Sequence, residues 1–236
     1  MEIDDLAMMR LRADGNFVRD DRGRLLCTNE PRADARRPAP RLFLGRTGLG
    51  YVVRFGATVP AGLADELAAR FARDLAFGSI ALPPATATAV RAILARDAPV
   101  VAETSGPVYR FPAILPRSDA AVRLTADNRA LLRVTYPWLH DELQDWQPCF
   151  AALDSDRAVS VCFSSRLGPA VAEAGLDTLR DHRRRGHAVA VTAAWAAAVQ
   201  ASGRIPIYST VWSNLASQGV ARRLGLAMFG EEATWT

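Results

Sequence analysis

The sequence predicts a mixed α/β fold in which a mostly antiparallel sheet is flanked by helices. Short apolar runs occur in hairpin-like pairs, and segments with helical spacing of apolar residues lie between them. A third observation is the stretch 170–201, where an apolar strand passes through a glycine-containing turn into an alanine-rich helix. The proline-containing segment 112–118 is the predicted boundary between two parts of the chain, residues 1–118 and 119–236.

The first part, residues 1–118, is predicted to be a small α/β region. Residues 1–40 show little periodicity, with one short strand at 24–27 and a loop at 33–41 that is rich in proline and arginine. The remaining expected elements are a hairpin at 42–44 and 51–55, helices at 61–75 and 85–96, and strands at 100–102 and 108–111. No motif here indicates a reaction, so the role of this region is left open.

The second part, residues 119–236, has a different order of elements. A strand at 122–124 precedes a helix that begins near Thr125 or Asp127 and extends toward Leu143, with a break or kink at Pro137. The elements expected beyond it are strands at 149–153, 158–164 and 170–178, a helix from Gly186 to Gly203, a strand at 205–210, a helix at 214–224 and a last strand or pair at 227–235.

Composition narrows the function classes. The chain has 236 residues, a net charge of +4 and 50% hydrophobic residues, which predicts a buried core. All 29 basic side chains are arginines spread along the chain, which does not favour nucleic-acid binding. The three cysteines form no CxxC pair, and neither a secretory signal nor a membrane span is found. We therefore expect a soluble, cytoplasmic protein that binds neither nucleic acid nor membrane.

The turn Arg183-Arg184-Arg185-Gly186-His187-Ala188 predicts an anion site. It lies between a strand and a helix, so the free backbone N–H groups of the helix N-terminus point toward it. Gly186 lets the backbone approach an anion closely, and the arginines add charged donors. A solvated run of charge is the alternative interpretation. His182 and His187 flank the turn without the spacing of metal ligands, so no metal site is predicted.

Two motifs give residues 121–236 a resemblance to the GNAT superfamily of acyl-CoA-dependent N-acyltransferases. The family's pyrophosphate signature is Gln or Arg, two residues, Gly, one residue, then Gly or Ala, which Arg183-x-x-Gly186-x-Ala188 fits. An Asn that opens the next-to-last helix is matched by Asn214, and a following Gly-hydrophobic pair by Gly225-Leu226. Both motifs have the expected secondary-structure context.

The resemblance implies a GNAT-type sheet and acetyl-CoA or another acyl-CoA as cosubstrate, without a metal. Backbone N–H groups from Arg184 to Ala188 would hold the pyrophosphate, the strand near Leu176–Leu179 the pantetheine and thioester, and Asn214 the pantetheine end. The cofactor-binding residues expected on this basis are Leu176, Thr178, Arg183, Arg184, Arg185, Gly186, His187, Ala188, Asn214 and Ser217.

The resemblance also implies a reaction and its candidate catalytic residues. Acetyl would pass directly from acetyl-CoA to an amine in a ternary complex. Glu173 is the candidate base, or else a structural partner of an arginine. The tyrosine that often protonates the thiolate is replaced by Ala221, so the acid would be Tyr208, Ser217 or water.

Three functions remain open at this point. The first is an N-acetyltransferase whose acceptor is a small-molecule or protein amine, with its oligomeric state unpredicted. The second is a non-catalytic acyl-CoA-binding regulatory module, which the missing tyrosine favours. The third is a nucleic-acid binder that uses the arginines, for which we expect DNA binding that falls steeply with salt.

Overall fold

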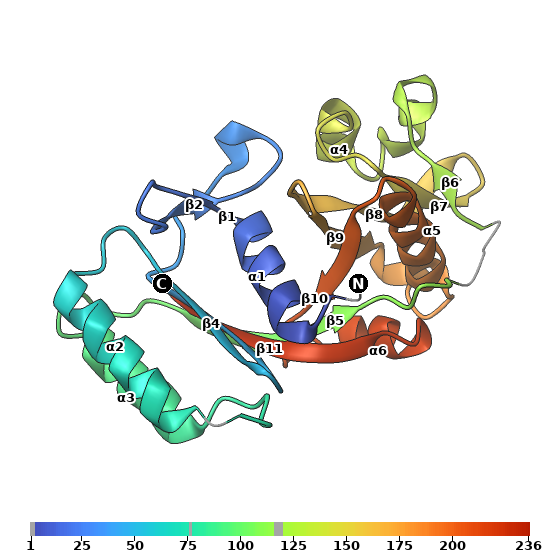
Figure 1. Ribbon diagram of the computed structural model, residues 1–236. Coiled ribbons are helices and arrows are strands. Elements are labelled where there is room, and N and C mark those ends of the chain that lie inside the picture. The colour runs from blue at the N-terminus through green and yellow to red at the C-terminus, as the bar shows by residue number, and fades with distance from the viewer. Residues whose placement is uncertain (1–2, 76, 116–119) are drawn as a thin grey trace.

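The computed structural model describes residues 3–75, 77–115 and 120–236. Within them the predicted mixed α/β fold, with a mostly antiparallel sheet flanked by helices, is confirmed (Figure 1). Nine of the described strands form one sheet in the order β4-β3-β11-β5-β10-β9-β8-β7-β6. Their bounds are β3 Leu42–Thr47, β4 Gly50–Phe55, β5 Glu103–Arg110, β6 Val122–Arg123, β7 Phe150–Asp154, β8 Arg157–Leu167, β9 Val171–Thr178, β10 Ile205–Ser209 and β11 Ala227–Trp235.

Helices cover both faces of this sheet. The helices are α1 Asp5–Asn16, α2 Ala61–Asp74, α3 Pro84–Leu94, α4 Pro137–Glu142, α5 His187–Ala201 and α6 Leu215–Arg223, with short 3-10 helices at Ala33–Ala35 (η1), Ala126–Leu132 (η2) and Arg180–His182 (η3). Met8 and Met9 of α1 pack with Val171 and Ile207 on one face of the sheet. Because side chains alternate along a strand, Ala172 and Tyr208 face the other way, toward α5 and α6.

The boundary predicted near residue 118 does not separate two sheets. β5 lies before it in the sequence and pairs with both β10 and β11, which lie after it. β3 likewise pairs with β11. Residues 116–119, part of the predicted linker, fall outside the described residues. The division into 1–118 and 119–236 therefore stays a prediction, while the strands of both parts share one hydrogen-bonded sheet.

Three sequence-based assignments differ from the structure. Residues 1–40 contain α1, which was not predicted because its apolar residues form only a narrow stripe beside the charged Arg12. Strands were expected at 100–102 and 108–111, on either side of Ser105–Pro107, but a single strand, β5, runs from Glu103 through Ser105–Pro107 to Arg110 and does not include 100–102. The helix expected toward Leu143 is η2 followed by α4, so the first part is a 3-10 helix, while the expected break at Pro137 is confirmed: Pro137 lies in the first turn of α4, where a missing N–H costs nothing.

A small second sheet lies outside the nine-stranded one. β1 (Phe17–Arg19) and β2 (Leu25–Thr28) form a separate two-stranded sheet, so the strand expected at 24–27 is confirmed. No helix within the described ranges combines the length and the apolar character needed to cross a lipid bilayer.

Gly106 tests the packing at the centre of the sheet. A Cβ built on Gly106 would lie 1.8 Å from the carbonyl oxygen of Thr210. Gly106→Ala is therefore expected to lower the free energy of unfolding by about 2–3 kcal/mol, because backbone must move to make room. The matched control is Gly62→Ala on α2, where nothing lies within 4 Å of the new Cβ. Urea unfolding of both variants is the measurement, and equal stabilities would contradict the register of β5.

Candidate active site

The strands β9 and β10 pair over a short distance and then part. Within the described chain their parallel register covers Ile205↔Val171, Pro206↔Ala172 and Ile207↔Glu173. β9 then continues to Thr178, still paired with β8, while β10 ends at Ser209. The separation leaves backbone of β9 without a partner on the β10 side. A gap of this kind gives a ligand access to the interior of the sheet and to backbone hydrogen-bonding groups.

One pocket opens at this separation, and we call it the turn pocket. Its volume is about 600 Å³, and it is lined by the end of β9, the turn before α5, the first residues of α5, and α6. Nearly all the predicted cofactor-binding residues meet here: Leu176, Thr178, Arg183, Arg184, Gly186, His187, Ala188, Asn214 and Ser217. The exception is Arg185, which lines an adjoining recess together with Arg180, Asp181, Arg183 and Arg184.

The turn itself has the backbone shape of an anion cradle. Arg184 has φ +63° and Gly186 has φ +87°, so the chain reverses locally and brings successive N–H groups to one side. Gly186 precedes α5 without a side-chain cap, and Ala190 donates to the Gly186 carbonyl. The amides of the first turn of α5 are therefore available to a ligand. The left-handed conformation of Arg184 costs about 1–2 kcal/mol, which an anion bound to the cradle would offset.

Two predicted residues of the turn pocket also have structural roles. Asn214 caps α6, since its Oδ1 accepts a hydrogen bond from the Ser217 N–H at 3.0 Å. The Asn214 side chain is exposed, and only its carbonyl oxygen is used by the cap. Arg183 Nε donates to the carbonyl of Thr178 at 3.1 Å, which holds the turn against the end of β9.

Tyr208, the candidate acid, lies on the α6 side of the sheet next to Ala221. Its hydroxyl is 2.7 Å from Ser217 Oγ, and burial raises the pKa of Tyr208 to about 12. The phenol therefore keeps its proton at neutral pH. Because Ser217 lines the turn pocket, Tyr208 is one hydrogen bond away from that pocket.

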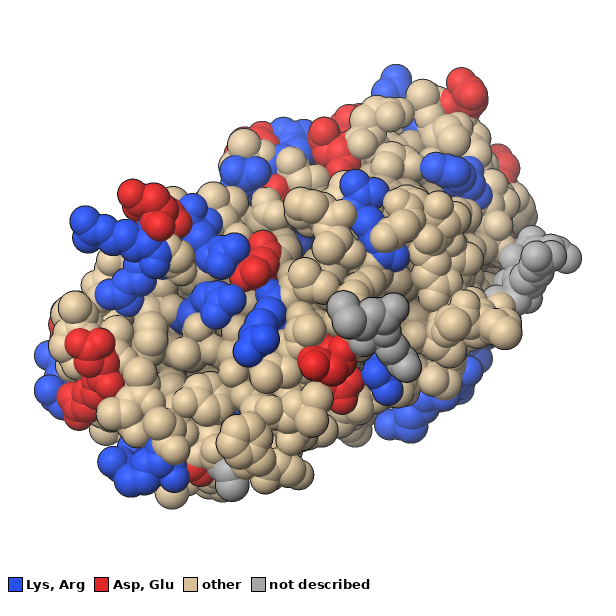
Figure 2. Space-filling model, in the orientation of Figure 1, with Lys and Arg blue, Asp and Glu red and all other residues tan. Residues whose placement is uncertain are grey.

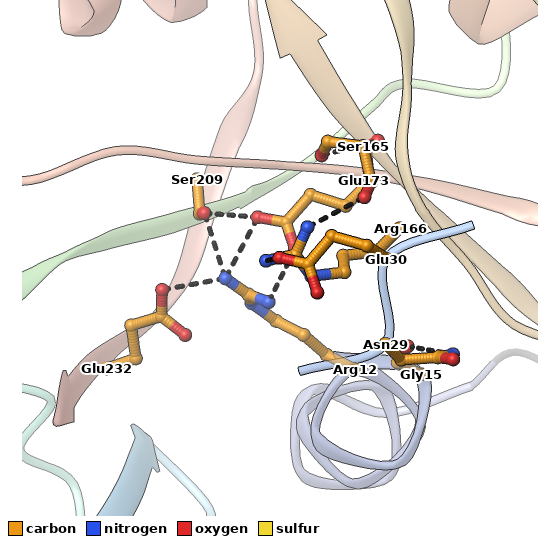
Figure 3. A network of polar contacts seen from close by, with 9 residues as sticks. All are labelled: Arg12, Gly15, Asn29, Glu30, Ser165, Arg166, Glu173, Ser209 and Glu232. Atoms are coloured by element: carbon orange, nitrogen blue, oxygen red, sulfur yellow. Dashed lines mark hydrogen bonds and ion pairs between the residues drawn. The ribbon is translucent and has the colours of Figure 1, made fainter. Parts of the chain in front are cut away.

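The opposite face of the sheet holds a second polar site, built around Arg12 of α1 (Figure 3). Arg12 is 2% exposed and donates from both terminal nitrogens to Glu173, at 3.0 and 3.1 Å. Its Nη2 also donates to Ser209 at 2.8 Å and to Glu232 at 2.7 Å. One arginine thus joins α1 to β9, β10 and β11.

This network borders a pocket of about 710 Å³, which we call the Arg12 pocket. Its lining combines Arg12, Glu173, Ser209 and Glu232 with residues of the segment 16–40. Glu173 is also at the last paired position of β9 and β10. The two pockets therefore approach the same separation of these strands from opposite faces of the sheet.

The two carboxyl groups in the network have different pKa shifts. Burial alone would raise the pKa of Glu173, but attraction to Arg12 and the hydrogen bond from Ser209 hold it below its ordinary value. Burial, together with repulsion from Glu173, raises the pKa of Glu232. Both oxygens of Glu173 are engaged by Arg12, and Ser209 donates to one of them. The prediction that Glu173 acts as base stays untested, and its engaged oxygens favour its alternative role as the partner of an arginine.

Sequence reasoning missed Arg12, Glu232 and Ser209. One available signal was Glu231-Glu232, two acidic residues inside an otherwise apolar last strand. Arg12 gave a weaker signal, because the helix that presents it was not predicted. The described residues contain no group of three or more His, Cys, Asp or Glu side chains that could hold a metal ion. His182 instead bonds Asp154, with 2.9 Å between Nε2 and Oδ2.

The comparison with family models concerns the C-terminal part of the chain. The profile of the family described as GNAT acetyltransferase matches residues 148–231. No curated protein matches the chain.

Solved structures similar to the chain include three proteins at low identity. One is an acetyltransferase from the GNAT family of Colwellia psychrerythraea (12% identity, TM-score 0.49, covering 100% of this chain and 97% of that one). Another is a GCN5-related N-acetyltransferase-like protein from Streptococcus suis (14%, TM-score 0.47, 84% and 85%). The third is a GNAT-family protein titled putative acetyltransferase from Novosphingobium aromaticivorans (19%, TM-score 0.47, 58% and 65%), so the match spans less than two thirds of that relative.

The Arg12–Glu173 pair predicts a dependence of stability on pH. Because the pKa of Glu173 is lowered in the folded state, its stabilisation is present above the unfolded value of about 4.3 and is lost as pH falls through the lower folded value. Glu173→Gln is expected to lower the free energy of unfolding by about 3 kcal/mol at pH 7 and to flatten this acid limb. The measurement is denaturant unfolding between pH 2 and pH 7.

The matched control is Glu66→Gln. Glu66 pairs with Arg96 at the surface, with side chains 43% and 58% exposed, so the expected loss is under about 1 kcal/mol. A Glu173 variant no less stable than the Glu66 variant would contradict the description of a buried ion pair.

Proposed function

We propose that the chain, whose residues 148–231 match the GNAT acetyltransferase family model, is an N-acetyltransferase that moves an acetyl group from acetyl-CoA to an amine. The observation that carries the proposal is the turn pocket. It combines an uncapped helix N-terminus, a cradle of backbone N–H groups and several arginines at the point where β9 and β10 part.

The turn pocket fits the chemistry of an acyl-CoA. Its arginines and the N–H groups of residues 184–188 suit the pyrophosphate, and the adjoining recess of Arg180, Arg183, Arg184 and Arg185 suits a further phosphate group. The lining nearer β9 is less polar, with Leu176 and Val189, and suits the pantetheine arm. Unpaired backbone of β9 beyond Glu173 offers N–H groups to polarise the thioester carbonyl.

The proposed reaction needs one proton acceptor and one proton donor. An ammonium acceptor first gives a proton to a carboxylate or to water, and the neutral amine then attacks the thioester carbonyl. The C–N bond forms, the C–S bond breaks, and CoA leaves as a thiolate. The nitrogen loses its second proton, and the thiolate gains one to give free CoA. The acyl group passes directly from the thioester to the amine in a ternary complex, without a covalent acyl-enzyme.

Tyr208 is the proposed proton donor in place of the tyrosine that Ala221 replaces. It lies against Ala221 on the α6 side of the sheet and reaches the turn pocket through Ser217. A thiol is a good leaving group, so the contribution of this acid is modest.

A non-catalytic acyl-CoA-binding module remains the alternative, favoured by Ala221 at the usual tyrosine position. The test is incubation with acetyl-CoA and a broad panel of amines. The enzyme releases free CoA only when an acceptor is present, whereas the module binds acetyl-CoA tightly without turnover.

Nucleic-acid binding is less favoured. Over the face shown in Figure 2, arginine side chains are interspersed with acidic ones.

We propose that the protein is cytoplasmic. The free thiols of Cys27, Cys149 and Cys162 support this location.

The arginines of the turn provide a test of cosubstrate binding. The double variant Arg183→Ala, Arg184→Ala is expected to weaken acetyl-CoA binding by at least about a hundredfold, because two charge-assisted hydrogen bonds to phosphate are lost, each worth about 1.5–3 kcal/mol. Isothermal titration calorimetry measures it. Arg129→Ala, an exposed arginine on η2, is the control and should bind as the wild type does. Equal affinity in all three proteins would contradict the site.

The role of Tyr208 has its own test. Tyr208→Phe is expected to lower kcat of amine-dependent CoA release about tenfold with KM for acetyl-CoA unchanged, because only departure of the thiolate is slowed. The matched control is Tyr109→Phe, since the Tyr109 ring lies 6.4 Å from that of Tyr208 in the same cluster. A kcat equal to that of the control would assign the proton to Ser217 or water.

A further inference from the structure

The Arg12 pocket has the features of a binding site and shares no lining residue with the turn pocket. Its volume of about 710 Å³ lies in the range of small-molecule sites. It reaches the separation of β9 and β10 at Glu173, which lies at the last paired position. A molecule in the Arg12 pocket would therefore face the end of the donor from the opposite side of the sheet.

The inner part of this pocket is held by hydrogen bonds to Arg12 and contains a buried polar atom without a partner. Arg12 is held by Glu173, Ser209 and Glu232, so its position is fixed from three strands. Its Nε is buried and has no hydrogen-bond partner among the described residues. Burying such an atom is unfavourable unless a ligand or water bonds it.

Glu232 is the acidic group best placed to receive an amine. Its Oε1 accepts from Arg12 at 2.7 Å, but no donor in the described part of the chain reaches Oε2. The residue lines the pocket, and its side chain is 21% exposed. By contrast, Arg12 occupies both oxygens of Glu173. Glu173 therefore positions Arg12, while Glu232 keeps one oxygen for a ligand.

Charge is distributed unevenly across the pocket. At the inner end, the single guanidinium group of Arg12 faces two carboxyl groups, those of Glu173 and Glu232. Farther out, Arg166 is paired with Glu30 at 2.7 Å. Arg37 is exposed, lines the pocket and has no side-chain partner within the described residues. The inner end thus favours a cation and the outer end an anion.

We propose that the Arg12 pocket is the acceptor site and takes a small primary amine that carries its own carboxylate, with the ammonium group on Glu232 and the carboxylate on Arg37. This inference rests on the proposed function for the reaction but concerns a separate pocket. Glu232 would take the proton that the ammonium group loses and pass it to water. The neutral nitrogen would then face the thioester through the gap between β9 and β10.

The test is a binding measurement that needs no turnover. The probes are the twenty L-amino acids and the ω-amino acids with two to five methylene groups, each beside its carboxamide. Binding to the full chain is followed by calorimetry with and without saturating CoA. At least one acid is expected to bind, and its carboxamide at least tenfold more weakly. Arg37→Ala should weaken binding of the acid about tenfold and leave the carboxamide unchanged.

Two further variants make the test specific. Arg36→Ala is the matched control, because Arg36 is the exposed neighbour of Arg37 and does not line the pocket; it should bind as the wild type does. Glu232→Gln should weaken binding of both the amino acid and its carboxamide. In the presence of acetyl-CoA it should lower kcat/KM for the amine acceptor about a hundredfold, while the affinity for acetyl-CoA stays unchanged.

The outcomes separate this inference from the proposed function. If acetyl-CoA binds and no acid in the panel does, or if carboxamides bind as tightly as acids, the inference is wrong and the donor site stands. If neither acetyl-CoA nor CoA binds, the proposed function fails. The assignment of the Arg12 pocket is then decided by amino-acid binding measured without CoA: binding supports the assignment, and its absence contradicts it.

Discussion

The buried guanidinium of Arg12 is the interaction on which the arrangement of this site depends. A buried cation is tolerated only when carboxylates and other acceptors surround it, and here they come from β9, β10 and β11. The same contacts fix α1 over the sheet, since Arg12 is the polar residue of a helix whose other buried side chains are mainly apolar. Breaking such a buried ion pair costs about 3–5 kcal/mol. The pair therefore fixes the position of α1 relative to the three strands.

The second constraint is the short pairing of β9 and β10. Three paired positions hold the two strands together, and beyond them the parting exposes backbone to both faces. The turn pocket lies toward α5 and α6, and the Arg12 pocket lies toward α1. Separate faces allow a donor and an acceptor to approach one point without sharing contacts. In the proposed acceptor site, this division gives a role to the N-terminal helix, which is distant in sequence from the anion turn.

Local patterns predicted the strand and the helix around the turn pocket well. The strand, glycine turn and helix at 170–201 depend on neighbouring residues, and a positive φ at Gly186 is what a close turn needs. The Arg12 pocket could not be predicted in the same way. Its members Arg12, Glu173 and Glu232 are far apart in the sequence. The pairing of β11 with β5, of β5 with β10 and of β10 with β9, together with the packing of α1 on the sheet, brings them together. β5 was itself divided wrongly, because Ser105–Pro107 has the composition of a turn.

The central claim is that an acyl-CoA enters between β9 and β10 from the turn pocket. A crystal structure with acetyl-CoA bound tests it most directly. The account predicts the pyrophosphate on the N–H groups of residues 184–188 and the thioester beside β9 just beyond Glu173, within reach of the Arg12 pocket. A pantetheine arm that runs outside the sheet, or a pyrophosphate bound away from Gly186, would contradict it.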